Sequence, residues 1–126
     1  MHEDRCILVV DDFSTMRRII KKILTKLNIS NILEAENGMQ AWEILCEHPV
    51  DLVICDWNMP GMTGMELLEK VREQSSLANL PFIMVTAESK TKVSLSEDQK
   101  KLTSYIAKPF KSEVLEEKLL FMLQGH

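Results

Sequence analysis

The chain has 126 residues, of which 45% are apolar and 27% are charged, and its formal net charge is −4. This size suits one domain with a single sizeable core, so we expect one domain over residues 1–126 and a monomer. The negative charge argues against nucleic acid as a partner, because phosphate backbones attract clustered Lys and Arg. The first apolar run, Cys6–Val10, is too short for a signal-peptide core or a membrane span, so we expect a cytoplasmic protein without a membrane partner.

The three cysteines are Cys6, Cys46 and Cys55, an odd number without the spacing of metal ligands. Cys6 and Cys55 lie in apolar runs, where cysteine usually serves as a small buried hydrophobic residue. The cysteines therefore favour a reducing compartment.

The first predicted element is a strand at Cys6–Val10, an apolar run rich in β-branched residues that suits burial on both faces. A helix follows, because Met16, Ile20, Ile23 and Leu27 recur at helical spacing with Ile19 and Leu24 beside them, and Ser14 is its expected N-cap. The next predicted elements are a strand at 32–35, a helix at Gly38–Glu47, a strand at 52–55, a helix at 65–74 and strands at 82–85 and 105–107. The last helix is expected at Ser112–Leu123, capped by Ser112, with one apolar face formed by Leu115, Leu119 and Met122.

Alternating strands and helices predict βαβ units, a parallel sheet and right-handed crossovers. A (β/α)₈ barrel needs about 250 residues, so the chain is too short for one and an open three-layer α/β sandwich remains. In such folds, ligands bind beyond the carboxyl ends of the strands, where the strand order reverses.

Four of the five predicted strands are followed by a polar residue whose side chain can bind a ligand or take part in a reaction. Asp11 and Asp12 follow the first strand, and Asp56, Thr86 and Lys108 follow the third, fourth and fifth. Taken singly, each has a structural explanation as a helix cap, a turn residue or a solvated charge. Their joint occurrence at one edge of the sheet instead indicates a functional site.

The three acids need a counter-charge, because two carboxylates about 4 Å apart repel by about 4 kcal/mol at an effective dielectric constant near 20. Carboxylates without His or Cys suit Mg²⁺, which accepts one or two carboxylates together with phosphate oxygens. Lys108 can pair with an acid or with a phosphoryl oxygen, and the Thr86 hydroxyl can donate to that oxygen. A carboxylate among these groups suits phosphoryl transfer, which requires positioning and charge neutralisation.

The residues around these strand ends resemble those of the CheY-like family, the single-domain chemotaxis response regulators. The resemblance covers nearly the whole chain and is carried by VVDDFSTMRR at 9–18, DWNMPGM at 56–62, VTAE at 85–88 and KPF at 108–110. It implies a flavodoxin-like (βα)5 three-layer sandwich with a parallel five-stranded sheet of order 2-1-3-4-5. In this strand order, the first and third strands flank the point at which the order reverses.

By this resemblance, Asp56 is the nucleophile that takes a phosphoryl group from a histidine kinase. Asp12, Asp56 and the backbone carbonyl of Asn58 would bind Mg²⁺ directly, and Asp11 would reach it through water. Thr86 and Lys108 match the pair that contacts the phosphoryl group.

The resemblance also implies roles outside the acidic cluster. Tyr105 matches the switch aromatic residue, which turns inward when Thr86 moves toward the phosphoryl group. The side chains of Asn58 and Glu88 match the positions that tune hydrolysis of the acyl phosphate. The surface that binds partners is expected to comprise the fourth helix, the fifth strand with Tyr105 and the fifth helix with Lys118. The Lys108-Pro109 bond is expected to be cis.

Two departures from the family pattern stand out. Thr63 replaces an acid before Gly64, which we expect to matter little for the chemistry. The stretch 89–104 lacks the usual alanine-rich helix, and Ser94 with Glu97 reads as a capping box. We therefore expect the fourth helix to run from about Leu95 to Leu102 after a mobile loop at 88–93; the alternative is an ordinary helix from about Thr91.

Other functional classes fit the sequence less well. A phosphatase of the haloacid dehalogenase type would carry its nucleophile as Asp-x-Asp after the first strand, and a flavin carrier would carry a hydroxyl-rich phosphate loop there. An interaction module that has lost phosphorylation is disfavoured because all five site residues are present. Within the favoured interpretation, the expected output is the flagellar motor switch, with a phosphatase as a further partner; a phosphorelay shuttle or a phosphate sink would use the same site.

Overall fold

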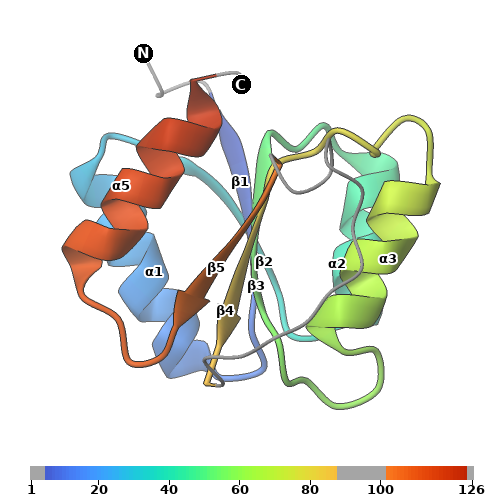
Figure 1. The fold of residues 1–126 in the computed structure, drawn as a ribbon, viewed down its shortest axis with the longest axis horizontal. Coiled ribbons are helices and arrows are strands. Elements are labelled where there is room, and N and C mark those ends of the chain that lie inside the picture. The colour runs from blue at the N-terminus through green and yellow to red at the C-terminus, as the bar shows by residue number, and fades with distance from the viewer. Residues whose placement is uncertain (1–4, 88–101, 125–126) are drawn as a thin grey trace.

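Five parallel strands form one sheet between two layers of helices in a computed structural model of the protein, which describes residues 5–87 and 102–124 (Figure 1). The strand order is β2-β1-β3-β4-β5, as predicted. The strands are β1 (Cys6–Val10), β2 (Asn31–Ala35), β3 (Leu52–Asp56), β4 (Phe82–Thr86) and β5 (Thr103–Ala107). The helices of the described ranges are α1 (Ser14–Lys26), α2 (Gly38–Glu47), α3 (Gly64–Glu73) and α5 (Ser112–Leu123).

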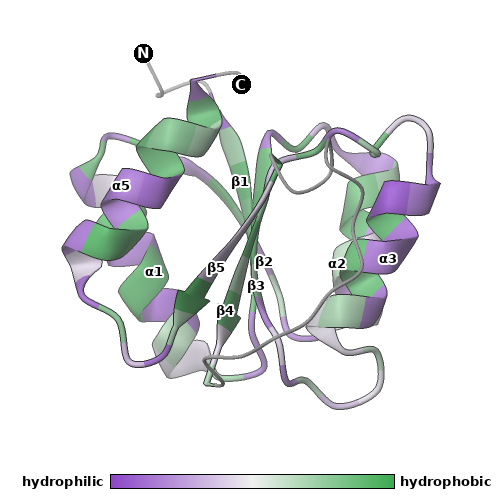
Figure 2. Ribbon diagram, in the orientation of Figure 1, coloured by the Kyte–Doolittle hydropathy of each residue, from purple (hydrophilic) through white to green (hydrophobic). Residues whose placement is uncertain are grey.

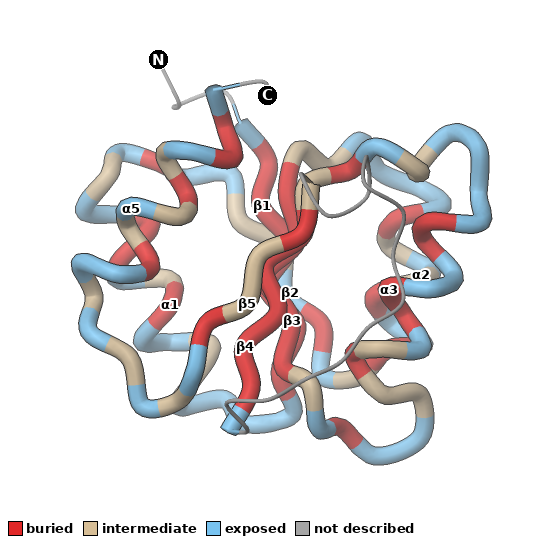
Figure 3. Tube along the Cα trace, viewed as in Figure 1, coloured by how far each residue is buried: buried red, intermediate tan, exposed pale blue. Residues whose placement is uncertain are grey.

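The burial of the strands explains their order. Every residue of β1, β3 and β4 is buried, whereas β2 and β5 expose part of their length (Figure 3). Strands that are buried on both faces must lie in the middle of a parallel sheet. Figure 2 shows the same division, with hydrophobic central strands and helices that carry hydrophilic residues on part of their surface.

Side-chain alternation along the strands divides the core into two clusters. On β1, Ile7 and Val9 face the cluster under α1 and α5, whereas Leu8 and Val10 face the cluster under α2 and α3. Among the described helices, α1 and α5 cover one face of the sheet, and α2 and α3 cover the other (Figure 1). Cys6 and Cys55 are buried as predicted, and Cys46 is exposed.

The first strand has the predicted bounds, whereas β2, β3, β4 and β5 are longer than the apolar runs that predicted them. Asp56 pairs with Val85 as the last residue of β3, and Thr86 pairs with Ala107 as the last residue of β4. At the other end of β5, Thr103 pairs with Phe82. Backbone pairing does not require an apolar side chain, so polar residues extend these strands beyond their hydrophobic runs.

Both predicted serine caps are wrong. Phe13, with an extended backbone, is the N-cap of α1, so Ser14 already lies inside the helix. Lys111 is the N-cap of α5, and the Ser112 hydroxyl bonds Glu113 Oε1 at 2.8 Å instead of a backbone N–H. Ile19, expected beside the apolar stripe of α1, is 44% exposed because it lies off the face that meets the sheet.

The predicted loop at 88–93, the hydrolysis-tuning residue Glu88 and the predicted fourth helix as far as residue 101 lie outside the described residues. Leu102, its expected last residue, lies in the turn that leads into β5. Within 5–87 and 102–124, no helix has the length and apolar character needed to cross a bilayer.

Candidate functional site

Three carboxylates meet at the carboxyl edge of the sheet. Asp11 and Asp12 follow β1 and Asp56 ends β3, and one oxygen of each lies within 4.8 Å of the others. Asp11 is 1% and Asp56 6% exposed, whereas Asp12 is exposed to solvent. The acids lie close together because β1 pairs with β3. This pairing places Val10 beside Cys55, and Asp11 and Asp56 are the residues that follow them.

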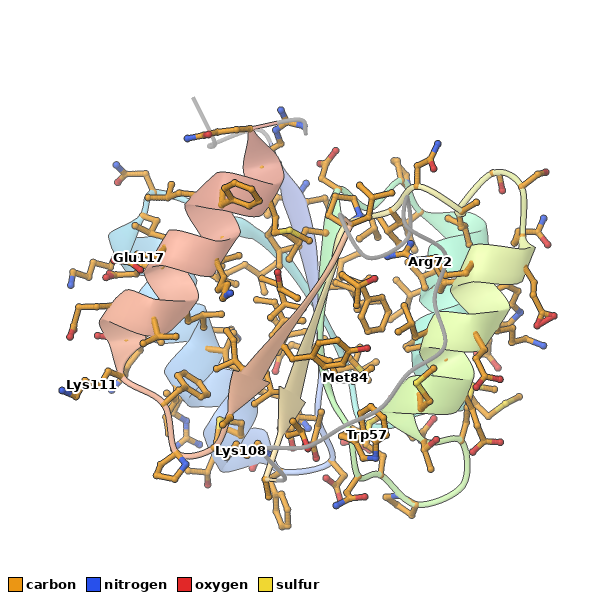
Figure 4. All side chains as sticks on the ribbon, in the orientation of Figure 1. Trp57, Arg72, Met84, Lys108, Lys111 and Glu117 are labelled. Atoms are coloured by element: carbon orange, nitrogen blue, oxygen red, sulfur yellow. The ribbon has the colours of Figure 1, made fainter. Side chains whose placement is uncertain are left out.

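Lys108 brings a positive charge to this cluster from the end of β5. Its Nζ lies 3.0 Å from Asp56 Oδ1 and 3.6 Å from Asp11 Oδ2. The Lys108 backbone N–H donates to the Thr86 carbonyl at 2.7 Å, which ties the ends of β4 and β5 together. The Lys108-Pro109 bond is cis, as expected. Lys108 lies at the strand ends marked by the arrowheads, and Trp57 begins the adjacent loop (Figure 4).

Opposing influences act on the pKa of the Asp11 carboxyl. Burial, the largest cause, raises the pKa of Asp11, and the Asp56 and Asp12 charges act in the same direction. The Phe13 N–H, which donates to Asp11 Oδ1 at 2.9 Å, and the Lys108 charge oppose this rise in pKa without cancelling it. A divalent cation would relieve the remaining repulsion, and the all-oxygen donor set of Asp11, Asp12 and Asp56 fits Mg²⁺.

Arg17 is a part of this region that the sequence interpretation missed. From α1 its Nη1 donates to the Asp11 carbonyl at 2.7 Å, and its Nε donates to Glu34 Oε1 at 2.9 Å. Its side chain is 12% exposed, whereas the neighbouring Arg18 is exposed to solvent. The available signal was its place in the first helix, six residues after Asp11 and on the face that meets the sheet.

The start of α3 lies directly against the end of β3. A side chain at Gly64 would collide with the Asp56 carbonyl oxygen and lie 2.9 Å from Met84 Sδ, so only glycine allows this approach. Thr63, the departure from the family pattern, caps α3: Glu66 N donates to Thr63 Oγ1 at 3.2 Å, and Thr63 N donates to Glu66 Oε1 at 3.0 Å. Thr63 thus matters for the helix that supports the site.

The other predicted site residues of the described ranges lie on β4, β5, α5 and the loop after β3. Thr86 is 2% exposed at the end of β4, next to the Lys108 backbone, and Asn58 is exposed two residues after Asp56. Tyr105 is partly buried in the cluster under α2 and α3, away from the acids, and Lys118 is partly exposed on α5.

Comparison with known proteins identifies the family. The family model "Response regulator receiver domain" matches residues 7–120. The chain is 48% identical to the chemotaxis protein CheY of Pseudomonas aeruginosa over 113 residues, which covers 90% of this chain and 91% of that protein. It is 44% identical to CheY-3 of Vibrio cholerae over 119 residues, covering 94% and 92% of the two chains.

Solved structures agree with this assignment. The chemotaxis response regulator CheY4 of Vibrio cholerae superposes with a TM-score of 0.80 at 29% identity, covering 94% of this chain and 98% of that one. Receiver domains are phosphoacceptor domains of two-component signalling that bind Mg²⁺ at an acidic pocket. The chain therefore belongs to the response regulator receiver domain family and is CheY-like, since its relatives include chemotaxis proteins of this type.

Proposed function

We propose that the protein is switched by a histidine kinase that transfers a phosphoryl group to Asp56. The observation that carries this proposal is the position of Asp56, which lies among Asp11, Asp12 and Lys108 with its carboxylate 3.0 Å from the ammonium. A carboxylate that attacks an anionic phosphoryl group needs positive charge beside it. Lys108 supplies one such charge, and the neighbouring carboxylates could hold a cation that supplies another.

In the proposed step, an Asp56 carboxylate oxygen attacks phosphorus while the phosphorus–nitrogen bond to the donor histidine breaks. The electron pair stays on the donor imidazole, which takes up a proton. Lys108 moves its ammonium from Asp56 Oδ1 to a phosphoryl oxygen, and the Thr86 hydroxyl donates to another. Mg²⁺, held by Asp12, Asp56 and the Asn58 carbonyl with Asp11 through water, would neutralise charge on the transferring group.

Loss of the phosphoryl group by hydrolysis resets the switch in this proposal. Asn58 is exposed two residues after the phosphoacceptor, where its side chain can meet an incoming water. We propose that Asn58 and Glu88 set the hydrolysis rate, and that a phosphatase partner accelerates it. The protein would catalyse only its own phosphorylation and dephosphorylation.

We propose that the output surface includes β5 and α5, with Tyr105 and Lys118 as contact residues. A hollow of about 360 Å³ lies there, lined by Ser104, Val114, Glu117, Lys118 and Phe121. Val114 is 40% and Phe121 52% exposed, and both lie at helical spacing from Lys118 on one face of α5. This face suits an apolar peptide with an acidic residue opposite Lys118. A segment of the flagellar motor switch is the proposed occupant, since chemotaxis proteins are among the relatives.

Phosphorylation can be tested with acetyl phosphate and Mg²⁺. We expect the fluorescence of Trp57, next to Asp56, to change in a Trp42→Phe background, which removes the other tryptophan. Asp56→Asn in the same background should abolish the change. A change that persists in Asp56→Asn would contradict the assignment of the phosphoacceptor.

The output can be tested by capture of partners with the protein in the form that beryllofluoride and Mg²⁺ give it, which mimics the phosphorylated state. We expect the motor switch protein among the captured proteins, and we expect Lys118→Ala to reduce its yield more than Lys22→Ala, a change to an exposed lysine on α1. Capture of a histidine-containing phosphotransfer protein in its place would favour the phosphorelay alternative.

A further inference from the structure

Arg72, near the end of α3, is a buried cation at the opposite end of the sheet from Lys108 (Figure 4). It is 7% exposed, and no carboxylate of the described ranges 5–87 and 102–124 lies within ion-pair distance of it. Burial lowers its pKa to about 10, which leaves the guanidinium charged at neutral pH. A buried charge without an acid is costly, and apolar side chains of similar volume often stabilise a fold as well. Among the described residues, hydrogen bonds to neutral oxygen atoms hold this charge.

The guanidinium joins three segments through backbone oxygens and one hydroxyl. Nη1 donates to the Leu80 carbonyl at 2.7 Å and to the Ala78 carbonyl at 3.1 Å, in the connection from α3 to β4. Nη2 donates to Thr103 Oγ1 at 2.9 Å and to the Leu102 carbonyl at 3.1 Å. Arg72 thus fixes the first residues of β5, the strand that carries Tyr105.

Tyr105 lies two residues after Thr103, so both side chains point to the same face of β5. The Tyr105 ring packs in the cluster under α2 and α3, where Met84 is its partner in the strand pairing. Within residues 5–87 and 102–124, the Tyr105 hydroxyl is buried without a hydrogen-bond partner, and so is Arg72 Nε. Burial raises the pKa of the Tyr105 phenol, and the nearby Arg72 charge acts in the opposite direction.

We propose that Arg72 is a positioning residue for Tyr105: it anchors the start of β5 and holds the phenolic oxygen inward by charge attraction, and so governs how far the ring is presented to partners. The last part rests on the proposed function, in which Tyr105 is the switch aromatic residue. The attraction itself is a property of the unphosphorylated protein and can be tested separately.

Tyr105 is the only tyrosine of the chain, so biosynthetic 3-fluorotyrosine places one ¹⁹F label at this position. Fluorine makes the phenol more acidic, which moves its titration toward pH values at which Arg72 keeps its charge. In the full-length unphosphorylated protein, we expect the neutral variants Arg72→Met and Arg72→Gln to raise the titration midpoint by about one pH unit. Arg72→Lys, which retains the charge, should restore most of the wild-type midpoint.

The direction in which the Tyr105 titration midpoint shifts distinguishes charge attraction by Arg72 from mechanical support of β5 alone. If Arg72 only braced the strand, its loss would let water reach the ring and would lower the midpoint toward that of an exposed phenol. An unchanged or lowered midpoint in both neutral variants would overturn the inference. Thr103→Val is the matched control, since it removes one hydrogen bond of Arg72 but keeps the charge, and it should leave the midpoint near that of the wild type.

The same label tests the link to the switch. Addition of beryllofluoride and Mg²⁺ should move the wild-type ¹⁹F resonance. The movement should be smaller in Arg72→Gln, because this variant lacks the attraction that holds the Tyr105 hydroxyl inward, both with and without beryllofluoride. A wild-type resonance that does not move would contradict the switch role of Tyr105 and the claim that Arg72 governs its presentation. The titration of the unphosphorylated protein would still decide the charge contact.

Discussion

The Lys108 ammonium lies 3.0 Å from Asp56 Oδ1, although 52 residues separate the two in the chain. Among the described residues, this lysine supplies the side-chain counter-charge of both buried acids, because it also lies 3.6 Å from Asp11 Oδ2. A divalent cation bound at this site and Lys108 would therefore neutralise the same carboxylates. Removal of the lysine should therefore lower the stability of the metal-free protein and increase the stabilisation that Mg²⁺ adds.

Lys108→Met should lower the free energy of unfolding by about 1 to 3 kcal/mol without Mg²⁺, because the Asp56 carboxylate loses its charged hydrogen-bond donor. The stabilisation gained on addition of Mg²⁺ should increase, since the ammonium no longer repels the cation. Urea unfolding with and without Mg²⁺ measures both effects. Lys111→Met, a change to an exposed lysine three residues later, is the matched control and should change neither. An unaltered Mg²⁺ effect in Lys108→Met would refute this account of the cluster.

Asp12→Ala should weaken Mg²⁺ binding at least tenfold and slow phosphorylation by acetyl phosphate, because it removes one of the three oxygen donors. The same change should stabilise the metal-free protein by up to about 1 kcal/mol, a small gain because Asp12 is exposed and its repulsion is screened. Mg²⁺ titration followed by Trp57 fluorescence gives the affinity. Glu43→Ala removes an equal charge from the exposed surface of α2 and serves as the control. Equal Mg²⁺ affinity in Asp12→Ala and the wild type would move the metal site elsewhere.

Glu34 should make the free energy of unfolding depend on pH in the range below its ordinary pKa of 4.5. The Lys21 hydrogen bond, at 2.9 Å, is the main reason that the pKa of Glu34 is lowered, and Arg17 adds to it. A lowered folded-state pKa gives stability that is present above the ordinary value of 4.5 and lost as the pH falls through the lowered value. Glu34→Gln should therefore cost a few tenths to about 1 kcal/mol at neutral pH, the usual range for a solvent-screened pair, and nothing in strong acid.

Urea unfolding of Glu34→Gln and the wild type across this pH range provides the test, with Glu43→Gln as an unpaired control. High salt should shrink the difference between Glu34→Gln and the wild type, since exposed ion pairs are screened. A difference that grows toward acid pH would show that the ion pair is not its cause.

The acidic cluster could be predicted from the sequence because its geometry follows from topology. Once the strands are parallel and ordered, Asp11, Asp12 and Asp56 must share an edge with Lys108. The helix caps could not be predicted in the same way, because the choice between Phe13 and Ser14 depends on the backbone path, which the Asp11 side chain fixes through the Phe13 N–H. Arg72 was missed because three of its four acceptors are backbone carbonyls, which leave no pattern in the side chains.

Thr63 is a different case, since its capping box with Glu66 has the local spacing of a known motif and was nonetheless overlooked. Thr63→Ala should cost about 1 kcal/mol of unfolding free energy, because it leaves the Glu66 N–H without its acceptor. Thr63→Asp should regain most of this loss, since an aspartate can also accept at the N-cap. Equal stability of Thr63→Ala and the wild type in urea unfolding would show that the box contributes nothing.

The central claim is that Asp56 carries the phosphoryl group, and chemical trapping of the acyl phosphate tests it most directly. The protein is treated with acetyl phosphate and Mg²⁺ and then with borohydride, which reduces an aspartyl phosphate to homoserine, and peptide mass spectrometry locates the product. We expect homoserine at position 56 in the wild type, much less of it in Lys108→Met and Asp12→Ala, and none in Asp56→Asn. Homoserine at position 11 or 12 in the wild type, or phosphoryl incorporation that persists undiminished in Asp56→Asn, would contradict the account.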